Sequence, residues 1–227
     1  MSPPPPPPPP EPSPPPAPDV VAQLNHWWRH GKPSNKVTEA GVLVRQFDAL
    51  SKVHPWEPCP EDKWCAKYRF IWPSSIINMK YNNRLYRGEN EAGLILAPPP
   101  HNRFYCIYAG DGNSMGHYSQ NHGCQQTQCE GRRTFDCSYT AEHMEEALTA
   151  NAETLKYNEV VVDAQHMKQH LPRALLGVFW TSGSTRELAT RVHGEFLKHY
   201  QMTPESFPLL HLSLDKGFSK QGVPQAG

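Results

Sequence analysis

Apolar residues in the last third of the chain fall into runs of two kinds, which alternate. Three runs are mainly apolar and of strand length: residues 159–164, which are continuous and β-branched, and residues 175–180 and 208–214. Two stretches between them show helical spacing: residues 165–171, ending at Pro172, and a helix opened by the capping box Ser184-x-x-Glu187. The order strand, helix, strand, helix, strand predicts right-handed crossovers and a sheet that is at least partly parallel.

The first half of the chain shows the same signals more sparsely. Asp19 is placed to cap a helix that ends near His30, with Gly31 and Pro33 just beyond it. Short apolar runs predict strands at 41–48, 75–78 and 93–97, a further run ends at Tyr108-Ala109, and a helix is predicted over 141–155. We therefore expect a single α/β domain over residues 19–227, with a mixed, partly parallel sheet flanked by helices. Residues 140–214 form its β-α-β-α-β half.

The N-terminal segment has a different composition. Residues 2–18 contain 13 of the chain's 25 prolines. Because proline lacks a backbone donor and fixes φ, we expect residues 1–18 to form a disordered polyproline II tail of about 3 Å per residue. Such a tail is a spacer, or a docking strip for the aromatic grooves of SH3- or WW-type domains.

The Ser-Pro-Pro-Pro blocks of this tail resemble the extensin-like and pherophorin-like glycoproteins of plant and green-algal cell walls. The remainder of the chain resembles globular modules of green-algal proteins to which no activity is attached. The resemblance implies secretion and a place in a cell wall or extracellular matrix.

Overall charge excludes one class of partner. Lys and Arg number 22, as do Asp and Glu, so the formal net charge is zero with neutral histidines. A general nucleic-acid or anionic-membrane binder needs a basic surface, and we expect neither partner here. No apolar run reaches 18 residues, so no membrane span is expected. No apolar segment follows Met1, so we expect no secretory signal within this chain.

Six cysteines at short spacings predict local disulfides, typical of an extracytoplasmic domain. The candidates are Cys59, Cys65, Cys106, Cys124, Cys129 and Cys137. Six cysteines allow 15 connectivities, and all of them stay open. The alternative is a cytoplasmic adaptor with free thiols that presents its Pro-rich tail. The Cys and His spacings do not match a zinc ribbon or finger, and we expect no metal and no cofactor.

One motif suggests catalysis. The segment Gly-Asn-Ser-Met-Gly around Ser114 resembles the Gly-x-Ser-x-Gly nucleophile elbow of the α/β-hydrolases. That resemblance implies a serine hydrolase with Ser114 as nucleophile, Asp163 as orienting acid and His211 as base, and with His166 and His193 as other candidate bases. An elbow opens a buried helix, whereas the residues after this motif are polar. A tight turn made by Gly, Asp and Asn is therefore the competing interpretation.

Side chains around the same turn are candidates for glycan contact. Sugar sites stack pyranose faces on aromatic rings and fix hydroxyls with Asn, Asp and Arg. The candidate ligand-binding residues are Arg103, Tyr105, Tyr108, Asp111 and Asn113. We thus expect an extracellular or cell-wall-associated domain with a binding or structural role, whose partners are wall glycans or glycoproteins. The serine hydrolase and the cytoplasmic adaptor are the alternatives.

Overall fold

The computed structural model describes residues 19–30, 42–47, 71–77, 90–99, 103–108, 118–119, 123–124 and 159–220 of the chain, and the statements below concern these residues. Several predictions lie outside the described residues: the Pro-rich tail, the helix over 141–155, the turn with Asp111, Asn113 and Ser114, and four cysteines (Cys59, Cys65, Cys129 and Cys137).

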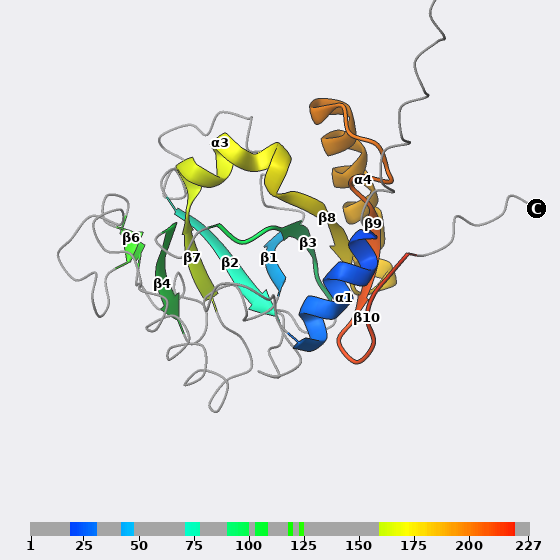
Figure 1. Cartoon of the computed structure of the whole chain (residues 1–227), viewed down its shortest axis with the longest axis horizontal. Coiled ribbons are helices and arrows are strands. Elements are labelled where there is room, and N and C mark those ends of the chain that lie inside the picture. The colour runs from blue at the N-terminus through cyan, green and yellow to red at the C-terminus, as the bar shows by residue number, and fades with distance from the viewer. Residues whose placement is uncertain are drawn as a thin grey trace, which may run out of the picture.

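Within the described ranges, eight strands form one mixed sheet in the order β10-β9-β8-β3-β1-β2-β7-β4 (Figure 1). The strands are β1 Val42–Phe47, β2 Ile71–Ile77, β3 Ala92–Leu96, β4 Phe104–Tyr108, β7 Glu159–Asp163, β8 Leu175–Trp180, β9 Leu209–Ser213 and β10 Gly217–Lys220. Strands β8 and β9 pair in parallel, and the other neighbours pair antiparallel. Two short strands, β5 Tyr118–Ser119 and β6 Gly123–Cys124, form a separate pair. The prediction of an α/β fold with a mixed, partly parallel sheet is confirmed.

Helices pack on both faces of the sheet (Figure 1). Helices α3 (Ala164–Ala174) and α4 (Gly183–Tyr200) cover one face, and α1 (Val20–His30) covers the other. Strands β1, β3 and β8 are buried on both faces, which is why their sequences are almost continuously apolar. The side chains under α3 and α4 include Leu43, Leu94 and Val178, and those under α1 include Val44, Ile95 and Phe179.

Of the two predicted crossovers, one joins strands that are parallel neighbours and the other does not. Helix α4 connects the parallel neighbours β8 and β9. Strand β7, in contrast, is not a neighbour of β8, because β3, β1 and β2 lie between them. Helix α3 therefore crosses the sheet, with contacts to β2, β7 and β8. The antiparallel pairings still give β7, β8 and β9 the same direction, so their carboxyl ends share one edge of the sheet.

Of three predicted helix boundaries, one is confirmed and two are wrong. Asp19 caps α1 as expected, since its Oδ1 accepts from the backbone of Val21 at 3.1 Å. The predicted end of the next helix at Pro172 is wrong: α3 runs on to Ala174 with the proline inside it. The capping box at Ser184 is also wrong, because α4 begins at Gly183 and Ser182 is its N-cap.

Strand β2 begins before its predicted start and contains Pro73. Its residues 71–74 pair with β7, and its residues 75–77 pair with β1. Proline has no N–H to give to a ladder, and the β1–β2 pairing ends at Val44 and Ser75. Beyond that pair the side chain of Gln46 links β1 to β2, because its Nε2 donates to the Ser75 hydroxyl at 3.1 Å.

Strand β10 was not predicted. A turn brings Lys216 N–H to the carbonyl of Ser213 at 3.2 Å, and Gly217 follows at φ 84° to start the strand. Such a turn closed by a left-handed glycine is a common hairpin connection. Asn25 of α1 then binds both backbone groups of Phe218: its Nδ2 donates to the carbonyl and its Oδ1 accepts from the N–H, each at 2.8 Å. Helix α1 is thereby tied to the edge strand.

Candidate functional site

Two residues that the sequence analysis assigned to different hypotheses lie in contact. Arg103 stands just before β4, and Asp163 ends β7, so the antiparallel pairing of these strands places the two residues side by side. The Arg103 Nη1 donates to Asp163 Oδ2 at 3.2 Å. The arginine side chain is 44% exposed and the aspartate side chain 11%. The ion pair is therefore open to solvent on its guanidinium side.

The second oxygen of Asp163 is also engaged. Its Oδ1 accepts from the backbone N–H of His166 at 3.0 Å, which makes Asp163 the N-cap of α3. Each carboxylate oxygen thus has one fixed partner and keeps further lone pairs, while Arg103 has five N–H donors of which one is used in this contact. The pair can both donate to and accept from a bound molecule.

Two histidines of α3 follow the cap. The rings of His166 and His170 are one helical turn apart, with centroids separated by 4.5 Å. Burial lowers the pKa of His166 most, and the neighbouring His170 and Arg103 lower it further, while Asp163 opposes them. These surroundings therefore favour the neutral imidazole of His166 over its protonated form.

A second polar cluster lies at the carboxyl end of β8. The hydroxyls of Ser182 and Ser184 both donate to Asn90 Oδ1. Within the same cluster the guanidinium of Arg186 stands 5.5 Å from the ring centre of Trp180, an arrangement that favours a cation–π contact. The Arg186 contact joins the first turn of α4 to the end of β8, and the bonds to Asn90 join it to the segment before β3.

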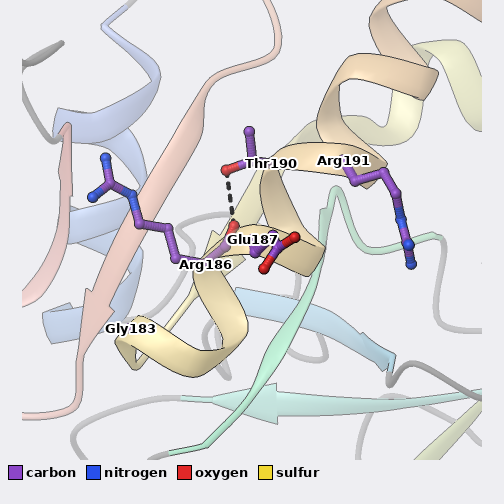
Figure 2. Close-up of a pocket in the computed structure, with 5 residues that line it drawn as sticks. All are labelled: Gly183, Arg186, Glu187, Thr190 and Arg191. Atoms are coloured by element: carbon purple, nitrogen blue, oxygen red, sulfur yellow. Dashed lines mark hydrogen bonds between the residues drawn. The ribbon is translucent and has the colours of Figure 1, made fainter.

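A hollow of 460 Å³ lies along the same helix (Figure 2). Its described lining residues all come from α4: Gly183, Arg186, Glu187, Thr190 and Arg191. In Figure 2 the two arginines extend to opposite sides, with Glu187 between them. The described lining residues belong to one helix surface, so they do not converge as the polar groups of an enclosed ligand pocket do.

The structure does not bring together the acid and base predicted for a hydrolase. Asp163 ends β7, whereas His211 is in β9, and four strands lie between them. Five strand spacings of about 4.8 Å put them roughly 24 Å apart. Asp163 instead faces Arg103, and the ring Nε2 of His211 lies 3.3 Å from the carbonyl of Thr181. The proposed orienting role of Asp163 toward His211 has no geometric support, and Ser114 lies outside the described residues.

The other two candidate bases differ in their surroundings. The Nε2 of His193 lies 2.6 Å from the carbonyl of Phe207, so it is engaged by the loop before β9. His166, in contrast, is held next to Asp163 through its own backbone.

Three of the five predicted ligand-binding residues lie in the described part of the chain, at the start of β4 and along it. Arg103 precedes the strand, Tyr105 lies at a register shift, and Tyr108 pairs with Glu159 at the far end of β7. Five residues at about 3.3 Å each separate Arg103 from Tyr108 by roughly 17 Å. Among the disulfide candidates, Cys106 is in β4 and Cys124 in β6. The disulfides remain a prediction.

Some residues of the candidate site were not singled out from the sequence. The His-x-x-x-His spacing of residues 166 and 170 is visible there, as is the Ser-Gly-Ser-Thr segment after β8. The contact of Arg103 with Asp163 has no local signal, because 60 positions separate them.

Among the described residues, no group of three or more His, Cys, Asp or Glu side chains is arranged to hold a metal ion. None of the helices in the described ranges has the length and apolar character needed to cross a membrane. Comparisons with protein-family models, with curated proteins and with solved structures give no match for this chain.

Proposed function

We propose that the chain is an extracellular or cell-wall-associated binding domain that contacts glycans at the Arg103 end of β4. The observation on which the proposal rests is the ion pair between Arg103 and Asp163, at 3.2 Å and half open to solvent. Neighbouring sugar hydroxyls each donate and accept hydrogen bonds. A guanidinium beside a carboxylate offers them donors and acceptors at one site.

The pair is also held in place before any ligand arrives. Asp163 is fixed by its capping bond to His166, and Arg103 is fixed by its bond to Asp163. A preorganised pair loses less side-chain entropy on binding, an effect of about 0.5–1.5 kcal/mol for each long side chain that need not be ordered.

Binding to wall polysaccharides and their oligosaccharides tests the site, by glycan array and by titration calorimetry. We expect Arg103→Ala to weaken binding at least tenfold, because it removes the exposed donor. Arg173→Ala is the matched control, since Arg173 is an exposed arginine in the last turn of α3 and should leave binding unchanged. Equal affinities of the two variants, or no glycan bound by the wild type, would overturn the proposal.

The variant Asp163→Asn distinguishes the role of the Asp163 charge in binding from its role in capping α3. Asparagine retains the oxygen that caps α3 and is as good an N-cap as aspartate, but it loses the negative charge that holds Arg103. We expect this variant to bind glycan more weakly while its thermal unfolding changes little. A variant that binds like wild type would show that the ion pair is not the contact.

The extracellular part of the proposal has its own test. Intact mass under non-reducing conditions distinguishes paired from free cysteines. Three disulfides support an exterior location, whereas six free thiols would refute it and favour an adaptor that presents the Pro-rich tail. A fluorophosphonate probe that labels Ser114, and fails to label Ser114→Ala, would restore the hydrolase alternative.

A further inference from the structure

We propose that His166 and His170 chelate a divalent transition-metal ion, of the kind that imidazole favours, such as Zn²⁺ or Cu²⁺. This site goes beyond the glycan proposal and does not depend on it. It also departs from the sequence-based expectation that the chain binds no metal.

The geometry of the two rings is the first support. Residues four apart lie on the same face of an α-helix, and the ring centroids of His166 and His170 are 4.5 Å apart at an angle of 45°. Within the described part of the chain, neither imidazole makes a hydrogen bond. Their nitrogen lone pairs are thus free to bind one ion. His193 and His211 differ, because a backbone carbonyl lies within 3.3 Å of the Nε2 of each.

The helix that carries the two rings is rigid. Asp163 caps its first turn, and Met167 and Leu171 on its inner face are 1% and 0% exposed. His170 is exposed and His166 is partly buried, so an ion can reach both. The helix backbone that carries both rings is therefore in place before the metal arrives, and only the two side chains need ordering on binding.

A second pair on α1 provides an internal comparison. His26 and His30 have the same spacing and ring centroids 5.0 Å apart. His30 is the last residue of its helix, and helix ends fray. We therefore expect the α1 pair to bind the same ion more weakly than the α3 pair.

Two protein ligands leave positions open on the ion. Structural zinc sites use four protein ligands, whereas sites that bind exchangeable molecules keep open positions. The remaining positions at the α3 pair are available to water or to an external carboxylate, imidazole or hydroxyl. An external group bound to the metal ion would lie near Asp163, because His166 is in the first turn of the helix that Asp163 caps.

The experiment uses the full chain in the background His26→Gln, His30→Gln, so that the α3 pair is the remaining pair of this spacing among the described residues. Calorimetric titration with ZnCl₂ is compared with and without His170→Gln. We expect the added substitution to remove one bound equivalent or to weaken it at least tenfold, since even outer-shell changes cost about 10- to 100-fold. His199→Gln, at an exposed histidine of α4, is the control and should leave the titration unchanged.

A spectroscopic measurement locates the bound ion without relying on the calorimetric affinity. Substoichiometric Cu²⁺ should broaden the imidazole NMR signals of His166 and His170 before those of the other histidines. His166→Gln should abolish the broadening at His170, and circular dichroism without metal checks that the variants stay folded. A titration unchanged by His170→Gln, or broadening that begins at other histidines, would overturn the proposal.

Discussion

Asn25 ties α1 to the edge strand of the sheet by hydrogen bonds, and its removal gives the clearest stability prediction. Its amide makes two hydrogen bonds of 2.8 Å to the backbone of Phe218. Each such bond contributes about 0.5–1.5 kcal/mol net, so both together contribute about 1–3 kcal/mol. Alanine in a helix gains back roughly 0.5 kcal/mol over asparagine. Asn25→Ala should therefore lower the free energy of unfolding by about 0.5–2.5 kcal/mol.

Urea denaturation measures this loss as a lower transition midpoint at unchanged slope. Gln23→Ala is the matched control, because Gln23 is an exposed amide two positions away on the same helix, and exposed substitutions stay within about 0.5 kcal/mol. Asn25→Asp keeps the acceptor for the Phe218 N–H and loses the donor for its carbonyl, so it should not restore full stability. If Asn25→Ala and Gln23→Ala unfold at the same midpoint, the reasoning fails.

Three further predictions concern stability. Gly217→Ala should cost more than about 1 kcal/mol, because its φ is 84° and a Cβ would collide with Asn25 Oδ1. In a urea double-mutant cycle the cost should shrink in the Asn25→Ala background, and additive costs would contradict this. Burial lowers the pKa of His193, so the unfolded chain binds the proton first as pH falls. Stability should be full above the ordinary pKa of 6.5 and drop as pH falls through the lowered folded value, and a urea-midpoint series should lose this step in His193→Gln. Asp163→Ala should lose about 1 kcal/mol with the α3 cap while Asp163→Asn loses less, as thermal unfolding will show, and equal losses would refute the capping role.

Much of the secondary structure could be predicted, because its signals are local. The apolar run at 175–180 gives β8 with the same limits, and Asp19 caps α1 as expected. The predicted helix boundaries were wrong where neighbouring residues could also begin or continue the helix. The capping box of α4 is formed by Ser182 and Thr185 rather than by Ser184 and Glu187. Helix α3 continues past Pro172, and the N–H of Leu175 still donates to the carbonyl of Leu171.

The arrangement of the strands could not be predicted in the same way. Nothing near β7 in the sequence shows that β2 and β4 are its neighbours, because such pairings join distant positions. The candidate site was the part least predictable from the sequence, because it depends on such a long-range strand pairing. Arg103 and Asp163 were each singled out for a different role, and their contact arises from the β4–β7 pairing.

The place of Pro73 in β2 has a mechanical consequence. The sheet joins its two parts, β10-β9-β8-β3-β1 and β2-β7-β4, through three residue pairs from Val42–Ile77 to Val44–Ser75. This seam of three pairs is shorter than the five pairs that join β1 to β3 and equal to the three that join β8 to β9. Under load the sheet should therefore part at one of these two short seams before it parts between β1 and β3. Helix α3 touches β2 and β7 on one side of the β1–β2 seam and β8 on the other. Helix α3 therefore bridges the two parts of the sheet. Amide exchange along β1 and β2 should accelerate when the packing of α3 on the sheet is weakened.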